Sequence, residues 1–327
     1  MKPSVSHAIL AVSLFSASLL SLSTAGAETR LGVRESSKTV CEGRGRCTEK
    51  QVVEFLSIKN GHLRGSAYLG QDAENAFKGG ESRFQFSNSF SAHVLETSSS
   101  TENVYGSNAA LNDAVQNGRV LGVVNSTARV HDGRRAYVES KTIEIHILKG
   151  TDLLRFMIPE VDGKLALDQI DLRKSTAAPN FELIEPSARI LGMFASKTLV
   201  SDGRRGGGHE VDTNHLLFIE GQSLGELVLD TDGNSTGLNR YAFDHAKIPT
   251  GAEVLGVRLS HDMFGNGRRG GGENLRTANI VMKQGDKITE LVIPLSSETG
   301  RLKTSDVKSI EHKTSGRGLV CPAVFRG

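Results

Sequence analysis

The sequence predicts an all-β fold made of four copies of one unit of antiparallel strands, because three features recur at fixed spacing. Each copy contains a Leu-Gly triplet, whose first residue is apolar in three copies and Arg30 in the first, then a Gly-Arg loop, and then a turn glycine. The loop glycine follows the triplet glycine by eleven positions in every copy, and the turn glycine comes 17 or 18 positions later. The glycines of the successive copies are Gly32, Gly43 and Gly61; Gly122, Gly133 and Gly150; Gly192, Gly203 and Gly221; and Gly256, Gly267 and Gly285.

The repeats divide one all-β domain, predicted to span 28–316, and leave a short C-terminal tail at 317–327. Their expected bounds are 30–117, 118–187, 188–251 and 252–316. The first repeat is longer because it carries extra segments, and in one of them Ser107 is expected to cap a short helix over 108–116.

Each repeat reads as about four strands joined by turns. The second strand is clearest at 142–148, where Ile143, Ile145 and Ile147 alternate with polar residues, as in a half-buried strand. Fourth strands are expected at 83–90, 167–172, 241–246 and 307–312. Four such units predict a small four-bladed propeller, which would place equivalent loops on one face. Two β-sandwich or barrel domains, each made of two repeats, are the alternative.

The first 27 residues are predicted to be a signal peptide. Lys2 precedes a short apolar stretch at 8–22, and Ala25-Gly26-Ala27 resembles a cleavage site. We therefore expect an exported protein, periplasmic or extracellular, with no transmembrane segment in the mature chain. The formal net charge of the whole chain is only +2, so no overall attraction to nucleic acid is expected.

Three cysteines in an exported chain leave one unpaired. Cys41 and Cys47 bracket the first Gly-Arg loop, and we predict a disulfide between them that staples this loop. A bridge from either of them to Cys321 is the alternative.

The Gly-Arg loops are the predicted ligand-binding residues. An Asp-Gly or Asn-Gly turn presents arginine, whose planar guanidinium suits carboxylate, sulfate or phosphate groups. The residues concerned are Arg44, Arg134, Arg135, Arg204, Arg205, Arg268 and Arg269. In the alternative reading these arginines only lock neighbouring units together, by pairing with nearby carboxylates. The candidates for that role are Glu139, Glu210, Asp212 and Glu273.

No nucleophile elbow, phosphate-binding loop or metalloprotease motif occurs in the sequence. We therefore expect a non-catalytic binding or scaffold protein with no cofactor and no metal, whose partner is an acidic polysaccharide, a lipid headgroup glycan or a protein. One alternative is a polysaccharide hydrolase or lyase that uses His131, His209 or His261 as its base. Another is a purely structural envelope or matrix protein. The acidic stretch 230–234 is expected to be a turn, because it lacks the distal glutamate of a calcium loop.

Overall fold

The computed structural model describes residues 28–42, 46–72, 102–131, 137–161, 163–176, 179–201, 208–265, 272–285, 287–296 and 299–312. These residues form four antiparallel sheets, one from each repeat, which we call blades 1 to 4. Blade 1 contains β1 (Thr29–Glu42), β2 (Arg46–Lys59), β3 (His62–Asp72) and β4 (Glu102–Gly106). Blade 2 contains β5 (Arg119–His131), β6 (Tyr137–Lys149), β7 (Asp152–Val161), β8 (Lys164–Leu165) and β9 (Asp171–Thr176).

The second half of the chain repeats this arrangement. Blade 3 contains β10 (Arg189–Ser201), β11 (Gly208–Glu220), β12 (Ser223–Leu229) and β13 (Ser235–Ala242). Blade 4 contains β14 (Glu253–Gly265), β15 (Gly272–Gln284), β16 (Lys287–Pro294) and β17 (Lys308–His312). Consecutive strands pair within each blade, except that β9 pairs with β7 beside β8. Each blade is therefore complete within its own repeat.

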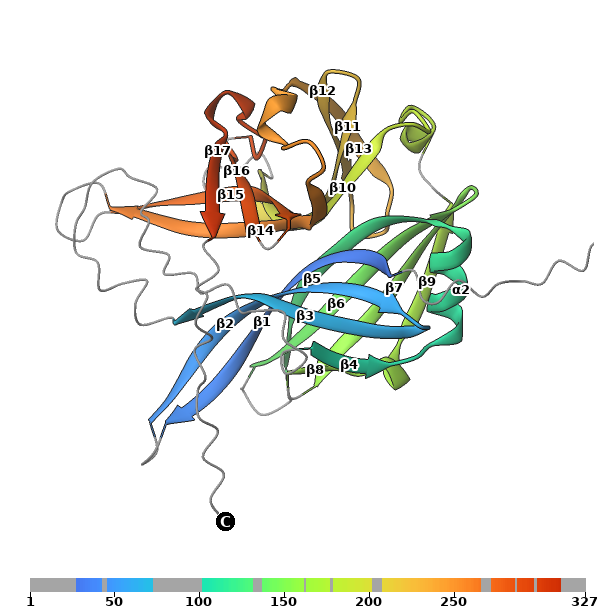
Figure 1. Ribbon diagram of the computed structural model, residues 1–327, viewed down its shortest axis with the longest axis vertical. Coiled ribbons are helices and arrows are strands. Elements are labelled where there is room, and N and C mark those ends of the chain that lie inside the picture. Colours follow the sequence, from blue (N-terminus) through green and yellow to red (C-terminus); the bar gives the residue numbers. More distant parts are fainter. Residues whose placement is uncertain are drawn as a thin grey trace, which may run out of the picture.

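The blades close into a ring through the glycines of the Leu-Gly triplets. The first strands contact one another in the cyclic order β1, β5, β10, β14 and back to β1 (Figure 1). A Cβ atom added to any triplet glycine would lie 2.5–2.9 Å from a backbone nitrogen of the next blade. The glycine and nitrogen pairs are Gly32 with Val123, Gly122 with Met193, Gly192 with Val257, and Gly256 with Val33. The protein is a four-bladed propeller, as the repeat predicted.

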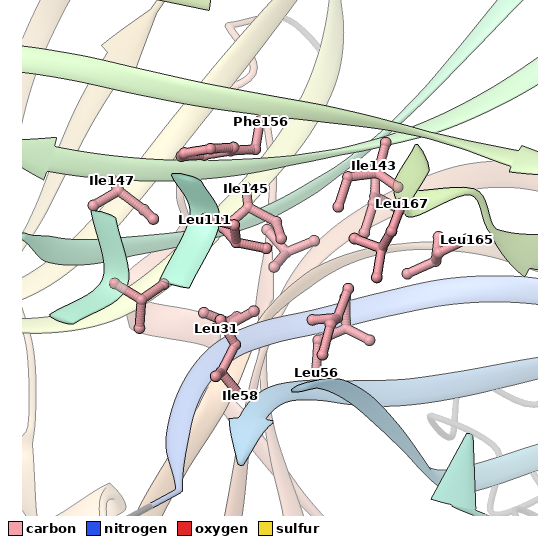
Figure 2. Packing of buried hydrophobic residues seen from close by; sticks show 14 of the residues in the cluster. Leu31, Leu56, Ile58, Leu111, Ile143, Ile145, Ile147, Phe156, Leu165 and Leu167 are labelled. Carbon is pink, nitrogen blue, oxygen red and sulfur yellow. The ribbon is translucent and has the colours of Figure 1, made fainter. Parts of the chain in front are cut away.

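Apolar clusters between neighbouring blades supply the core. Between blades 1 and 2, Leu31, Leu56 and Ile58 face the isoleucines of β6 (Figure 2). Ile143, Ile145 and Ile147 are at most 2% exposed, as predicted, but the expected alternation with exposed polar residues is wrong at His146, which is 0% exposed, because β6 is buried on both faces there. The cluster between blades 4 and 1 is the smallest of the four in the described residues. Its members are Val33, Val53, Phe55, Leu255, Val281 and Ile288.

Several predicted elements need correction. The helix exists as α2 (Ala109–Asn117), but Asn108 caps it by accepting from the Leu111 backbone N–H, so the assignment of the cap to Ser107 was wrong. The outer strand of blade 1 is β4, and the expected strand at 83–90 lies outside the described residues.

The outer strands of blades 2 and 3 also lie elsewhere than expected, while β17 agrees with prediction. In blade 2 a 3-10 helix, Leu167–Gln169, occupies the start of the expected strand, and β9 begins after it. In blade 3, β13 ends at Ala242, and the 3-10 helix His245–Lys247 follows. Within the described residues, no helix is long and apolar enough to cross a membrane.

Candidate functional site

The four Gly-Arg loops lie at the tips of the hairpins that join the first and second strand of each blade. Strand pairing continues to both edges of every loop. The last pairs are Glu42 with Arg46, His131 with Tyr137, Ser201 with Gly208, and Gly265 with Gly272. The predicted ligand residues Arg44, Arg134, Arg135, Arg204, Arg205, Arg268 and Arg269 are outside the described residues.

The hairpins extend from one end of the ring, which we call the hairpin face. The first strands pack through equivalent glycines in cyclic order, so they run in the same sense around the axis. Each continues nine or ten residues beyond its glycine, as β1 does from Gly32 to Glu42, which is about 30 Å of extended chain. In Figure 1 the β1–β2 and β14–β15 hairpins both point away from α2.

The cysteines fall on the first of these hairpins. Cys41 of β1 stands directly opposite Cys47 of β2 in the strand register. Residues in such positions have Cβ atoms about 4.5–5.5 Å apart, close to the range that a disulfide spans. Their thiol groups are outside the described part, and the Cys41–Cys47 bridge stays a prediction.

A ring of serines marks the base of the hairpins, four residues beyond each triplet glycine. Its members are Ser36, Ser126, Ser196 and Ser260. In three blades the residue opposite the serine is a threonine: Thr142, Thr213 or Thr277. The sequence reading missed this ring, although the Gly-x-x-x-Ser spacing is visible in all four repeats.

Below the hairpins, buried ion pairs join blade 1 to blade 2. Arg34 of β1 is 1% exposed, and its Nε donates to Glu54 at 2.7 Å while its Nη1 donates to Glu160 of blade 2 at 3.0 Å. Burial alone would lower the pKa of Arg34, but the charges of Glu54, Tyr105 and Glu160 outweigh it and raise the pKa. The pKa of Tyr105 is also raised, chiefly by burial. The arginine is therefore a permanently charged link between the two blades.

A second link of this kind joins blade 4 to blade 1. Arg258 is the equivalent of Arg34 in blade 4, because both follow their triplet glycine by two positions. Its Nη2 donates to Glu290 at 3.0 Å, and its Nη1 donates to Glu35 of blade 1 at 2.8 Å. The side chain of Asn279 donates to the same Glu290 carboxylate at 2.7 Å. Arginine at this position thus links neighbouring blades.

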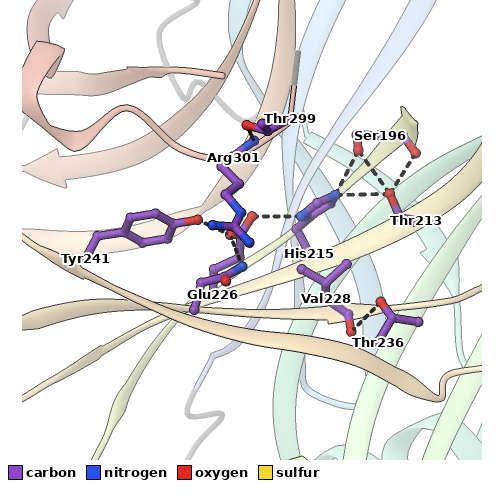
Figure 3. Close-up of polar contacts among 10 residues, drawn as sticks. Ser196, Thr213, His215, Glu226, Val228, Thr236, Tyr241, Thr299 and Arg301 are labelled. Atoms are coloured by element: carbon purple, nitrogen blue, oxygen red, sulfur yellow. Dashed lines mark hydrogen bonds and ion pairs between the residues drawn. The ribbon is translucent and has the colours of Figure 1, made fainter. Parts of the chain in front are cut away.

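Blade 3 carries a different hydrogen-bond network at the level of the ring that Arg34 and Arg258 occupy in their blades (Figure 3). The Oγ of Ser196 lies 2.8 Å from Nε2 of His215, whose Nδ1 lies 2.8 Å from Oε1 of Glu226. The other carboxylate oxygen of Glu226 accepts from Tyr241 at 2.6 Å and from Asn239 at 3.1 Å. Burial would raise the pKa of Glu226, but these hydrogen bonds and the nearby imidazole outweigh it and lower the pKa.

The same pair of side chains, an asparagine and a tyrosine two residues apart, also holds a carboxylate in blade 1. There Asn103 and Tyr105 donate to Glu54, which comes from the second strand of the blade. In blade 3 the carboxylate comes from the third strand, because His215 takes the position equivalent to Glu54. Gly65 stands where blade 3 has Glu226 and leaves room for Tyr105 and Glu54, since a Cβ there would lie 2.9 Å from the Tyr105 ring and 3.2 Å from Oε2 of Glu54.

The histidines predicted as alternative bases do not share one level of the ring. His131 and His261 follow their triplet glycines by nine and five positions, while His209 is paired with Val200, eight positions after Gly192. Their side chains are outside the described part. No group of three potential metal ligands occurs among the described residues. The stretch 230–234 is a turn, as expected, in which the Asp230 carboxylate accepts from the backbone N–H groups of Asp232 and Asn234.

A scan against protein-family models finds no match for this chain, and a search of curated protein sequences finds none either.

Proposed function

We propose that the protein is an exported binding protein whose Gly-Arg loops contact an anionic partner. The observation that carries the proposal is the closed glycine ring, since it makes four equivalent hairpins extend from one end of the propeller. Loops with arginines at four symmetric places offer several contacts to one partner at once. The signal peptide expected at 1–27 supports export.

The energetics favour a polymeric partner over a single small anion. An exposed ion pair contributes about 0.2–1 kcal/mol, so four of them give at most about 4 kcal/mol. Micromolar affinity needs about 8 kcal/mol. A chain with repeated negative groups closes this gap, because the first contact raises the effective concentration of the next group near the remaining loops. We therefore favour an acidic polysaccharide among the candidate partners.

Retention on heparin resin as a function of salt tests the proposal. The Arg204→Ala, Arg268→Ala double variant is expected to elute at lower salt than the wild type, since two of the four contacts are lost. The matched control is Lys59→Ala with Lys283→Ala, which removes the same charge beside turn glycines at the other end of the blades. Elution that depends neither on salt nor on the two arginines would contradict the proposal.

A further inference from the structure

We propose that Ser196 is an activated nucleophile toward small carboxylic esters, with His215 as its general base and Glu226 as the positioning residue. This proposal is independent of anion binding at the loops. It rests on a continuous chain of hydrogen bonds, in which both links of the Ser196–His215–Glu226 series measure 2.8 Å. A hydroxyl, an imidazole and a carboxylate in this order are the arrangement that activates serine in unrelated hydrolases.

The hydrogen-bond directions fit this role. The Glu226 carboxylate is ionised, because its pKa is lowered, so the Nδ1–H of His215 donates to it. The imidazole Nε2 then presents a lone pair and accepts the proton of the Ser196 hydroxyl. The Thr213 hydroxyl also lies 3.1 Å from Nε2, but the Ser196 hydroxyl is closer at 2.8 Å, and Thr213 has a second acceptor in the backbone oxygen of Ser196 at 3.3 Å.

The surrounding side chains hold the series rigidly. The ring of Phe194 stacks on His215 with centroids 4.6 Å apart and planes 5° from parallel. Tyr241 and Asn239 fix the far oxygen of Glu226. The imidazole is thus held on its face and at Nδ1, with Nε2 directed at the Ser196 hydroxyl.

Comparison of the blades shows that this series is special to blade 3. In each blade, the residue two positions before the serine pairs with a residue of the second strand. In successive blades that second-strand residue is Glu54, Glu144, His215 or Asn279. Ser260 of blade 4 is buried to a similar degree as Ser196, 8% against 5% exposed, and also faces a threonine. It has Asn279 where Ser196 has His215, and so serves as an internal control.

The reaction balances with an ester and water as the only reactants. The Ser196 Oγ bonds to the acyl carbon while its proton passes to His215 Nε2. The bond to the alcohol then breaks, and the alcohol leaves with that proton. Water, deprotonated by the same nitrogen, releases the carboxylic acid and restores the serine. Since Ser196 is only 5% exposed, the acyl group it accepts is a small one such as acetyl.

Brief incubation of the purified full chain with p-nitrophenyl acetate, followed by acid quenching and peptide mapping of the acetyl adduct, tests the proposal without any variant. The expected result is an adduct on Ser196 and none on Ser260. Hydrolysis of p-nitrophenyl acetate should be lost in Ser196→Ala and retained in Ser260→Ala. An absence of adduct on Ser196, or equal labelling of both serines, would overturn the proposal.

The role of Glu226 has its own test. Removing the orienting carboxylate of a serine triad lowers the rate about 10⁴-fold, so Glu226→Gln should slow labelling of Ser196 by at least about 100-fold and shift its pH profile. If Glu226 were merely structural, the folded Glu226→Gln variant would label Ser196 at the wild-type rate and with the wild-type pH profile. That result would refute the assignment of Glu226 as the positioning residue. Thermal unfolding of each variant establishes that the protein measured is folded.

Discussion

Replacing Gly192 by alanine tests the closure of the ring directly. The residue has φ 136°, a value that side-chain-bearing residues rarely adopt. An added Cβ would lie 2.8 Å from the backbone nitrogen of Val257 and 3.2 Å from two backbone atoms of Gly256. Neither contact can be relieved by turning a side chain, because the opposing atoms belong to the main chain of blade 4.

The expected loss of stability follows from two contributions. Holding alanine in an unfavourable backbone region costs about 1–3 kcal/mol, and overpacking a tight contact costs about 1–3 kcal/mol more. The free energy of unfolding should therefore fall by about 2–6 kcal/mol, a large part of the 5–15 kcal/mol typical of a domain. Urea denaturation followed by far-UV circular dichroism measures this change as a lower transition midpoint.

Gly221→Ala is the matched control for this experiment. Gly221 also has positive φ, 55°, but nothing lies within 4 Å of the position of an added Cβ. Its replacement should cost only the backbone contribution. If Gly192→Ala proved no more destabilising than Gly221→Ala, the close approach of blades 3 and 4 would be refuted.

Three further predictions concern buried charge and the first hairpin. Arg258→Ala should lower the free energy of unfolding by about 3–5 kcal/mol, because Glu290 is left charged and buried without its arginine; denaturation at neutral pH checks this. The lowered pKa of Glu226 means that its contribution is present above the pKa of the unfolded state, about 4.3, and is lost as pH falls through the folded value. Glu226→Gln should accordingly show a smaller loss of stability on acidification than the wild type, as measured by melting temperature against pH. A Cys41–Cys47 disulfide should give a crosslinked peptide that separates on reduction and should add about 2 kcal/mol of stability; two thiols that alkylate without prior reduction would contradict it.

The fold could be predicted from the sequence because the spacing of the glycines reflects where the backbones of neighbouring blades must approach closely. The triplet glycines occupy positions where a Cβ would meet the next blade, so each repeat had to keep one at the same place. The outer strands were harder to predict, since β9 is exposed along nearly its whole length and shows no alternation of buried and exposed positions. Leu172, expected to end a strand, lies instead within an exposed one.

The interblade networks could not be read from local patterns. Arg34 and Glu160 are 126 positions apart, and Arg258 and Glu35 are 223 apart, so only the closed ring brings them together. The Ser196 series joins three strands of one blade and depends on their register. Its serine was visible as a repeat position, whereas the pairing of His215 with Glu226 was not.

Because none of the described strands is shared between repeats, the junction of blades 4 and 1 is of the same kind as the other three, although these two blades are not consecutive in the chain. Its small apolar cluster is supplemented by ion pairs of Arg258 with Glu35 and of Arg30 with Glu253. A circularly permuted gene that begins at another blade boundary should therefore encode the same assembly. Gene duplication could equally have built the ring one whole blade at a time, with no intermediate that required a strand borrowed from the opposite terminus.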